Sequence, residues 1–167
     1  EAGKEHGRMC LNLIPVNVGS QTQLWPLPNM DTIFTQVGNA KYVSVLDAKD
    51  AYHGVKLTER ASKLTSFITP DGQWEYTRGC FGLANLPSAF CRIMACALNG
   101  MQSFAVSYLD DIIVFSDTLA DHRRHLHAVL QRTAQYNILI SAKKMQICTN
   151  EVKILGHILL PGVGIKP

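Results

Sequence analysis

Two adjacent carboxylates, Asp110 and Asp111, lie between two runs of strand-forming residues, Phe104–Tyr108 and Ile112–Phe115. The pattern predicts a strand, a tight turn and a second strand, with the carboxylates at the tip of an apolar hairpin. Neighbouring like charges repel, and apolar surroundings disfavour ionised carboxylates, so this placement is costly without a cation. Mg²⁺ takes oxygen ligands and often binds one or two carboxylates together with substrate phosphates. The motif alone leaves two interpretations open, a divalent-metal site or a surface turn.

A third carboxylate, Asp47, follows the predicted strand Lys41–Leu46 and comes directly before a turn. If this strand is a neighbour of the hairpin, Asp47 and Asp110 face each other and can hold two metal ions. Two metals about 3.5–4 Å apart stabilise the attacking and leaving oxygens of an in-line phosphoryl displacement. The backbone amides after Asp47 can then bind a triphosphate. Taken alone, Asp47 is better explained as a helix N-cap, and only the pairing with Asp110 favours phosphoryl transfer.

The elements that must position these carboxylates form an α+β pattern, with helices packed on one antiparallel sheet. Caps and breakers predict helices from Asn29 or Asp31 to Val37, over about 87–98, and from a cap at 116–118 to about 136. A short helical turn is expected at 49–53. Besides the hairpin, strands are predicted at 8–14, 41–46, 55–57, 64–68, 73–78, 138–140 and 152–160. The apolar stripe expected on the last helix is Leu119, Leu126, Val129, Leu130 and Thr133.

The composition suits one domain with a sizeable core, since 47% of the 167 residues are hydrophobic and 17% are charged. The net charge, 16 − 13 = +3, permits a polyanionic partner without requiring one. No apolar run is long enough to span a bilayer and no signal peptide is recognised, so no membrane partner is expected. Five scattered cysteines without a CxxC spacing indicate reduced thiols of an intracellular protein. The sequence does not distinguish cytoplasm from nucleus.

Four segments follow one another along nearly the whole chain: Val45–His53, Phe81–Phe90, Tyr108–Ser116 and Ser141–His157. In this order they resemble the motifs of reverse transcriptases, most of all those of gypsy-type long-terminal-repeat retrotransposons and their retroviral relatives. The first is similar to the family's first carboxylate motif, the second to its FGLxNAPxxF stretch and the third to its YxDD hairpin. The fourth resembles the segment that leads into the primer-gripping hairpin. Each motif is moderately specific, and the order of all four argues against chance.

The resemblance implies the palm and part of the fingers of a right-hand polymerase. Residues 1–40 are expected to form partial fingers and the connection to the palm, 41–58 palm, 59–86 the fingers hairpin and the return to the palm, and 87–167 palm ending at a primer-grip-like hairpin. Both ends look cut, so we expect a fragment without thumb, connection and RNase H. The implied activity is RNA-directed DNA polymerisation, which transfers a nucleotide from a dNTP to a primer 3′-hydroxyl on an RNA or DNA template. Two Mg²⁺ or Mn²⁺ ions are implied, and the oligomeric state is not.

The resemblance also assigns roles to individual residues. Asp47 and Asp110 are expected to ligate the ions, with the Ala48 carbonyl as a further ligand and Asp111 as the third, supporting catalytic carboxylate. Tyr52 matches an aromatic ring that lies under the sugar and excludes a 2′-hydroxyl, although a core tyrosine explains it equally well without the family. Arg8 matches an arginine that clamps the triphosphate, and Lys4 aligns loosely as its companion. The other implied nucleotide-binding residues are Lys49, Asp50, Ala51, Phe81 and Gly82, and the implied primer-binding residues are Tyr108, Leu155, Gly156 and His157.

Several positions depart from the family pattern. Residues 12–14 are Asn-Leu-Ile where the family usually has Asp-Tyr-Arg, so a contact within the fingers is expected to be missing. Cys80 replaces a proline and Leu86 replaces an alanine, which predicts overpacking worth about 1–3 kcal/mol unless neighbours adjust. Lys144 is a candidate proton donor to pyrophosphate, but a solvated lysine is the favoured interpretation.

A cluster of histidines lies on the last predicted helix, and its members are His122, His125 and His127, with Arg123 and Arg124 between them. Because no carboxylate or cysteine has a suitable spacing, a solvated face is favoured over a zinc site. The arginines are likewise interpreted as solvated rather than bound to a phosphate backbone.

Two alternative functions stay open at this level. The first is a non-catalytic nucleic-acid-binding or scaffolding module derived from a retroelement, which would not need metal-dependent nucleotide binding. The second is another palm polymerase, such as an RNA-dependent RNA polymerase, against which Tyr52 argues.

Overall fold

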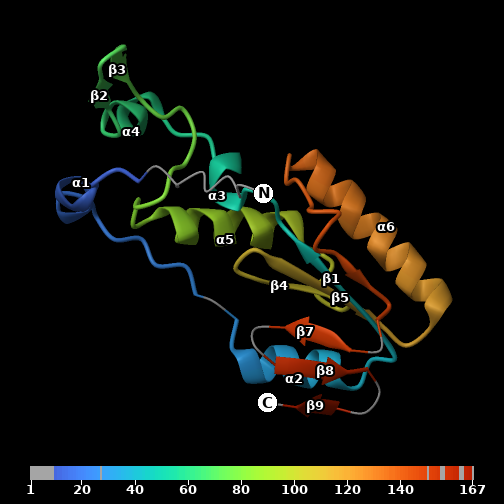
Figure 1. Cartoon of the computed structure of the whole chain (residues 1–167). Helices are drawn as coiled ribbons and strands as arrows, with labels where there is room; N and C mark the ends of the chain where they lie inside the picture. The colour runs from blue at the N-terminus through green and yellow to red at the C-terminus, as the bar shows by residue number, and fades with distance from the viewer. Residues whose placement is uncertain (1–9, 27, 150, 155–156, 162–163, 167) are drawn as a thin grey trace, which may run out of the picture.

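The computed structural model describes residues 10–26, 28–149, 151–154, 157–161 and 164–166. Its central sheet has the strand order β4-β5-β1-β6, with antiparallel pairing throughout. The strands are β1 (Tyr42–Asp47), β4 (Ala105–Tyr108), β5 (Asp111–Ser116) and β6 (Gln146–Ile147). Helices α5 (Leu86–Ala97) and α6 (Leu119–Gln135) lie on one face of this sheet (Figure 1). The expected α+β palm with packed helices is therefore confirmed.

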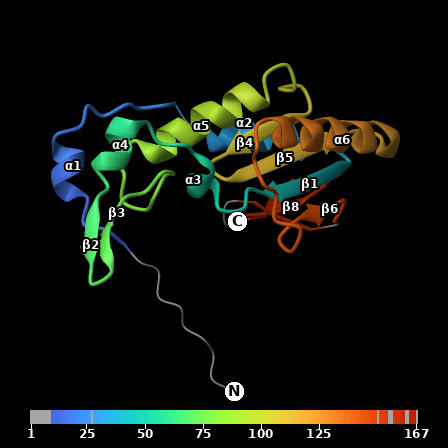
Figure 2. The same cartoon turned by 90° about the horizontal axis from the view of Figure 1, so that it is seen from above.

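The other face of the sheet is covered by α2 (Met30–Gly38) and by a three-stranded sheet (Figures 1 and 2). That second sheet has the order β7-β8-β9 and consists of β7 (Val152–Ile154), β8 (His157–Leu160) and β9 (Gly164–Lys166). Alternate residues of β1 enter two different cores, because successive side chains of a strand point to opposite faces. Val43 and Val45 pack against α2, whereas Leu46 packs against α5 and α6. Covering on both faces explains why β1 and β5 consist almost entirely of apolar residues.

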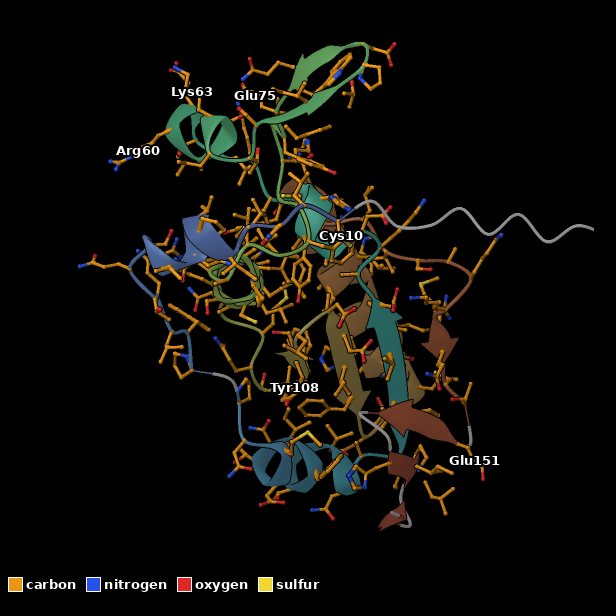
Figure 3. The ribbon with its side chains drawn as sticks, turned by 60° about the vertical axis from the view of Figure 1, so that its left-hand side comes forward. Cys10, Arg60, Lys63, Glu75, Tyr108 and Glu151 are labelled. Atoms are coloured by element: carbon orange, nitrogen blue, oxygen red, sulfur yellow. The ribbon has the colours of Figure 1, made fainter. Side chains whose placement is uncertain are left out.

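A smaller group of elements lies apart from these layers, and it includes the segment 59–86 for which the fingers hairpin was expected (Figures 1 and 2). It contains α1 (Ile14–Val18), α4 (Glu59–Lys63), β2 (Phe67–Thr69) and β3 (Gly72–Trp74). Figure 3 shows Arg60, Lys63 and Glu75 on this group, well away from Tyr108 on the palm. A short antiparallel ladder joins it to the palm: the Gly79 N–H donates to the Val55 carbonyl (2.8 Å), and the Leu57 N–H donates to the Thr77 carbonyl (3.0 Å).

Most elements were placed correctly from the sequence, and the errors lie both in this smaller group and beside the central sheet, where β6 was not predicted. The three expected helices and the acidic hairpin are confirmed. The strand expected at 8–14 is wrong where it is described, because residues 10–13 are irregular and α1 follows, with a proline in its first turn. Helix α4 was missed, although the Thr58 side chain caps it by accepting the Ala61 N–H. The strands expected at 55–57 and 138–140 are reduced to single bridges, Lys56 with Arg78 and Ala48 with Ile140.

The face that α6 buries differs from the expected stripe. Val129 and Thr133 are buried as expected, but Leu119 and Leu130 are 50% and 38% exposed. His122 is instead fully buried, so the solvated face expected for the histidine cluster is wrong at this position. Its Nε2 lies 2.8 Å from Ser44 Oγ on β1, and its Nδ1 lies 3.0 Å from Ser116 Oγ on β5. Two strand hydroxyls therefore satisfy a polar side chain that periodicity alone assigned to solvent.

His122 gives the fold a pH dependence. Burial, followed by the nearby His125, lowers the pKa of His122 below its ordinary value of 6.5. The unfolded chain therefore binds more protons than the folded chain below that value, and the stability linked to neutral His122 is lost as the pH falls. The raised pKa of Asp111, about 6, acts in the opposite sense, so the expected result is a difference between two proteins. The stability of the parent chain relative to His122→Gln should decrease as the pH falls through 6.5. Urea unfolding at each pH measures it.

The matched control for this experiment is His127→Gln, which removes an exposed histidine of the same helix. It should keep the pH dependence of the parent chain. Because all three proteins carry the same carboxylates, the difference between their curves isolates His122. Identical curves for His122→Gln and the parent chain would show that the buried imidazole does not set the dependence.

Gly79 explains how the chain accommodates Leu86. A Cβ at position 79 would lie 2.4 Å from the Tyr52 carbonyl oxygen and 2.6 Å from Leu86 Cδ1, so Leu86 occupies space that only glycine leaves free. We expect Gly79→Ala to lower the free energy of unfolding by about 1–3 kcal/mol. Gly54→Ala is the control, because nothing lies within 4 Å of a Cβ there, and it should change stability by less than about 0.5 kcal/mol.

A double variant separates the two contacts at Gly79. Adding Leu86→Ala to Gly79→Ala removes the side-chain clash but leaves the contact with the Tyr52 carbonyl, so only part of the expected loss should be recovered. Equal stability of Gly79→Ala and Gly54→Ala in chemical denaturation would contradict this account of the glycine.

Candidate active site

The register of the central sheet brings the predicted carboxylates together at one end of its two inner strands, β1 and β5. Strands β1 and β5 pair so that Asp47 stands opposite Asp111, and β4 and β5 pair so that Tyr108 stands opposite Asp111. Leu109 and Asp110 form the loop between the two hairpin strands. The Ala48 N–H donates to the Asp110 carbonyl (2.8 Å), which ties the end of β1 to the hairpin tip. The two strands are neighbours, which is the arrangement that a shared site for Asp47 and Asp110 requires.

The tip of the hairpin has an unusual backbone conformation. Leu109 has a φ of 53°, a region that side chains with a Cβ seldom adopt. A two-residue loop with a positive φ at its first position only is of the type II′ kind, in which that position is usually glycine. A leucine in this conformation costs of order 1–3 kcal/mol, and such costs concentrate at functional sites. The backbone at Leu109 fixes the position of Asp110 next to Asp111.

The electrostatics of the three carboxylates reflect their crowding. Burial raises the pKa of Asp111 to about 6, with further contributions from Asp110 and Asp47, while Lys144 opposes the shift. Asp111 is thus mostly ionised at neutral pH, but burial and the neighbouring carboxylates make its ionised form less favourable, which costs free energy. A divalent cation would remove this cost, since three carboxylates are hard oxygen ligands of the kind that Mg²⁺ and Mn²⁺ bind. The chemistry of the donor set therefore fits the ions that the sequence implied.

Lys144 lies in direct contact with this cluster. Its Nζ is 3.0 Å from Asp47 Oδ2, and the hydrogen bond to Asp47 is the main reason that the pKa of Lys144 is raised. The lysine is solvated, as the favoured interpretation expected, since 68% of its side chain is exposed, and it also pairs with Asp47. In the described part of the chain, no group of three or more His, Cys, Asp or Glu side chains forms a metal site by itself. Mg²⁺ usually completes its shell with water and substrate phosphates.

The amides that follow Asp47 are only partly open to a ligand. The Ala48 N–H is bonded to Asp110, and the Lys49 N–H donates to the Leu139 carbonyl (2.8 Å). These two groups are therefore not available to a triphosphate, which corrects the expectation for the backbone of Lys49. Helix α3 (Ala51–Gly54) begins just after Asp50, whose φ is 51°. The first N–H groups of a helix lack a carbonyl in a preceding turn, so Ala51 and Tyr52 supply the open donors.

Tyr52 lies between the carboxylates and two phenylalanines. Its ring centroid is 6.1 Å from that of Phe81 and 6.2 Å from that of Phe90, with near-perpendicular planes in both pairs. Burial raises the pKa of Tyr52, followed by the charge of Asp110. The ring is half-buried: Phe90, which is buried, supports it from inside, and the more exposed Phe81 contacts it from the surface side. One side of the Tyr52 ring can therefore pack against the core while the other faces a ligand.

The loop that carries Phe81 and Gly82 is held by an asparagine that the sequence did not single out. The Asn17 Nδ2 donates to the Gly82 carbonyl (2.7 Å), and the Asn17 Oδ1 accepts the Ala84 N–H (3.0 Å). Gly82 has a φ of +100°, which favours glycine there. Asn85 makes a second clamp, accepting from the Gln23 N–H (2.9 Å). Both contacts join residues more than sixty positions apart, so no local pattern could have revealed them.

Two of the four candidate primer-binding residues, Tyr108 and His157, are described, and both lie on the α2 side of the central sheet. Tyr108 is half-buried and packs against the core between the sheet and α2. His157 begins β8 opposite Ile154, and its ring is 5.1 Å from that of Phe34 in an edge-on contact. Leu155 and Gly156 lie outside the described residues, as do Lys4 and Arg8. In its described part, the hairpin of β7 and β8 therefore contacts α2 through His157.

An antiparallel palm sheet with carboxylates at one edge and separate fingers elements defines the class of right-hand nucleic-acid polymerases. Residues 3–159 match the family model described as reverse transcriptase (RNA-dependent DNA polymerase). The chain therefore belongs to the reverse transcriptase family.

Curated relatives are polyproteins of viruses and transposons. The enzymatic polyprotein of Figwort mosaic virus (strain DxS) is 37% identical over 93% of this chain and 24% of that protein. The retrovirus-related Pol polyprotein from transposon 297 of Drosophila melanogaster is 32% identical over 99% of this chain and 16% of that protein. The chain thus spans about a quarter or less of the length of these relatives.

Solved structures share the fold. The foamy viral protease-reverse transcriptase in complex with RNA/DNA hybrid matches with a TM-score of 0.80 and 25% identity, over 95% of this chain and 21% of that one. The foamy viral protease-reverse transcriptase dRH in complex with double-stranded DNA matches with a TM-score of 0.82 and 24% identity, over 90% of this chain and 26% of that one. Across the described residues, no helix is both long and apolar enough to cross a membrane.

Proposed function

We propose that this chain is the catalytic palm and part of the fingers of an RNA-directed DNA polymerase of a retroelement. The observation that carries the proposal is the pairing of β1 with β5, which places Asp47 opposite Asp111 with Asp110 in the adjoining loop. Foamy viral relatives of the same fold have been solved with an RNA/DNA hybrid and with double-stranded DNA. Template and primer bound along the palm, with a dNTP as the second substrate, are the corresponding partners proposed here.

Each residue of the site has its own role in the proposed nucleotidyl transfer. Asp47 and Asp110 would hold two Mg²⁺ or Mn²⁺ ions, assisted by the Ala48 carbonyl, with Asp111 supporting the site. When bound, such ions stabilise the attacking 3′-oxygen and the leaving pyrophosphate. The open amides of Ala51 and Tyr52 bind phosphate oxygens of the dNTP. Much of the acceleration in such a reaction comes from positioning and electrostatic stabilisation.

Three further groups orient the substrates in this proposal. Tyr52 packs under the deoxyribose, supported by Phe81 and Phe90. Gly82, held by Asn17, brings the loop backbone close to the nucleotide and template. Lys144 neutralises Asp47 and lies where it can donate a proton toward the departing pyrophosphate. Arg8, Leu155 and Gly156 complete the proposed nucleotide and primer contacts from outside the described residues.

Single-nucleotide primer extension on an RNA template tests the proposal. The chain is mixed with primer–template and one complementary dNTP in Mg²⁺, in Mn²⁺ or with a chelator. A catalytic palm extends the primer by one nucleotide only when the metal is present. Metal-independent binding of the hybrid without extension would instead favour a non-catalytic nucleic-acid-binding module.

A further inference from the structure

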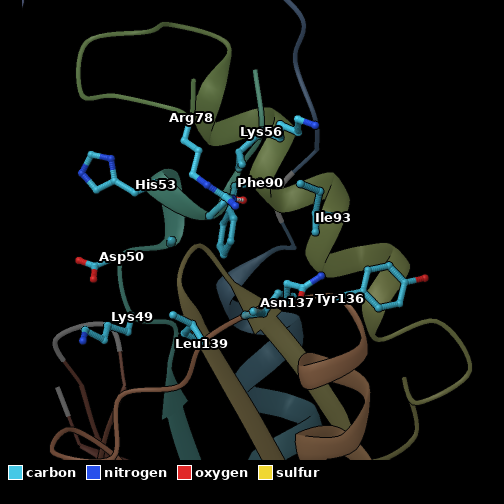
Figure 4. Close-up of a pocket in the computed structure, with 14 residues that line it drawn as sticks. Lys49, Asp50, His53, Lys56, Arg78, Phe90, Ile93, Tyr136, Asn137 and Leu139 are labelled. Atoms are coloured by element: carbon cyan, nitrogen blue, oxygen red, sulfur yellow. Dashed lines mark hydrogen bonds between the residues drawn. The ribbon is translucent and has the colours of Figure 1, made fainter. Parts of the chain in front are cut away.

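A pocket of about 610 Å³ lies behind α3, and the three carboxylates are not among the residues that line it. Its walls come from α3, α5 and the segment that follows α6, and we call it the rear pocket. Figure 4 shows Arg78 reaching toward Phe90 on one side, with Asn137 and Leu139 on the opposite side. The volume falls within the range of about 300–1,000 Å³ that is usual for small-molecule sites. Ala51 and Phe90 belong both to this pocket and to the site proposed above, whereas Tyr52 and the three carboxylates do not line the pocket.

The floor of the rear pocket is formed before any ligand arrives. Asn137 has a φ of 55° and follows the last turn of α6, where its N–H donates to the Ala134 carbonyl (3.0 Å). The next amide, of Ile138, donates to the Thr133 carbonyl (2.9 Å), so the helix end is closed by paired bonds. The Leu139 carbonyl accepts the Lys49 N–H (2.8 Å). A floor fixed at these points loses little conformational freedom on binding, which favours affinity.

The lining combines an apolar body with a positively charged edge. Phe90 and Ile138 are buried apolar residues of the wall, and Ile93 adds a partly buried aliphatic side chain. Three cations, Lys49, Lys56 and Arg78, line the same pocket against one carboxylate, that of Asp50. Figure 4 shows the heads of Lys49 and Asp50 turned outward, whereas the guanidinium of Arg78 lies over the pocket near Phe90. Arg78 is therefore the charged group closest to the apolar wall.

Arg78 has hydrogen-bonding capacity left for a ligand. Its Nη1 donates to the Gly54 carbonyl (3.0 Å), which positions the guanidinium at the pocket. A guanidinium has five N–H donors, and its planar fork matches the two oxygens of an acidic group. An apolar cavity with one such cation is complementary to a molecule that has an apolar body and a single anionic head. A neutral apolar molecule would leave the guanidinium without an anionic partner.

The geometry points to the rear pocket as a second ligand site, for a small amphipathic anion with an aromatic or aliphatic body and one acidic head. The site is also linked to Tyr52. Phe90 lines the pocket, and its ring meets that of Tyr52 edge-on with centroids 6.2 Å apart. A ligand that packs on Phe90 therefore contacts the side chain that supports Tyr52 from inside. This inference does not depend on the proposed polymerase activity, because the pocket and its charges belong to the fold.

NMR titration of the isotopically labelled chain with 2-naphthoate tests the site, with 2-naphthalenemethanol as the neutral probe of similar shape. Saturable shifts are expected at the amides of Gly54, Asn137 and Tyr52, with an affinity at least about tenfold higher for the acid than for the alcohol. Arg78→Met should remove that preference, whereas Arg60→Met, on exposed α4, should keep it. Ile93→Trp, which fills the pocket while leaving Arg78 in place, should abolish the shifts.

Several results would overturn the assignment. Equal affinity for the acid and the alcohol would show that the charge of Arg78 contributes nothing. Shifts centred on Asn17 and Asn85 would place the ligand in the adjoining pocket between α1, α4 and α5, which shares Val55, Lys56 and Ile93 with the rear pocket. Unchanged binding by Ile93→Trp would exclude the rear pocket, and the same spectra show whether each variant is folded.

Discussion

Replacing Asp110 with asparagine is expected to reduce single-nucleotide incorporation by about a thousandfold or more. The substitution keeps the size of the side chain but removes the charge at the hairpin tip. An amide oxygen is a weaker ligand for a hard divalent ion than a carboxylate, and charge that develops in phosphoryl transfer must be neutralised there. Single-turnover incorporation in Mn²⁺, with the parent chain beside the variant, measures the loss.

The fold of the Asp110→Asn variant can be followed separately from its activity. Asp110 is the largest electrostatic contribution to the raised pKa of Asp111, after burial. Removing this charge should therefore bring the pKa of Asp111 down and leave thermal stability equal to that of the parent chain or higher. Loss of activity with retained stability would assign the effect to the chemistry of the site rather than to unfolding.

Asp117→Asn is the matched control for this prediction. Asp117 follows the far end of β5 and is exposed, and it precedes the cap residue of α6. The variant makes the same chemical change on the same polypeptide segment but far from the hairpin tip, and it should keep its activity within about twofold. If Asp110→Asn retained a tenth of the parent rate, the proposed role of Asp110 would be wrong.

The parts of the fold that the sequence predicted correctly share one physical cause. Strand β1 and the acidic hairpin have apolar residues on both faces and end at carboxylates, so their type and ends were evident from composition and turn signals. The starts of helices α2 and α6 could be predicted from the candidate cap residues Asn29 and Thr118. In the structure, both side chains accept backbone N–H groups. The sequence left open whether β1 and β5 are neighbours, and the structure supplies both their pairing and its register.

The errors arise where distant partners decide the outcome. His122 has a polar side chain on a helix and was assigned to solvent, but Ser44, from a strand far away in the sequence, provides its partner. Asn17 and Asn85 become clamps only because residues 17–23 return to the loop at 82–85. The Lys49 amide is occupied by Leu139, whose strand-like segment was predicted without its pairing. Contacts of this kind depend on tertiary structure, which local periodicity does not encode.

The departures from the family pattern are explained in part by a neighbouring residue. Leu86 was expected to overpack the start of α5, yet it is only 5% exposed and fits because Gly79 leaves room for its methyl groups. Cys80, which stands in place of a proline, is also buried, and burial raises the pKa of its thiol. Cys80 lies between Gly79 and Phe81 in the sequence, and Leu86, the first residue of α5, packs against Gly79. Gly79 thus compensates for the larger side chain of Leu86, so the packing here is kept although position 86 departs from the family pattern.

Replacing Tyr52 with valine is expected to relax the choice of sugar, raising the ratio of ribonucleotide to deoxynucleotide incorporation by about 10- to 100-fold. The half-buried ring of Tyr52 meets the buried Phe90 and the exposed Phe81 edge-on, so it cannot move away from a 2′-hydroxyl without disturbing these contacts. Valine removes the ring and leaves space for that hydroxyl. Competitive single-nucleotide extension with each matched pair of nucleotides measures the ratio.

Tyr52→Phe provides the matched control, because it keeps the ring and its two edge-on contacts while removing only the hydroxyl. It should retain the sugar preference of the parent chain. The valine variant is also expected to lose stability, since a large buried aromatic surface is removed. That loss lowers the fraction of folded protein for both nucleotides equally, so it cancels in the ratio. An unchanged ratio in Tyr52→Val would therefore exclude the ring as the determinant of sugar choice, whatever the variant's total activity.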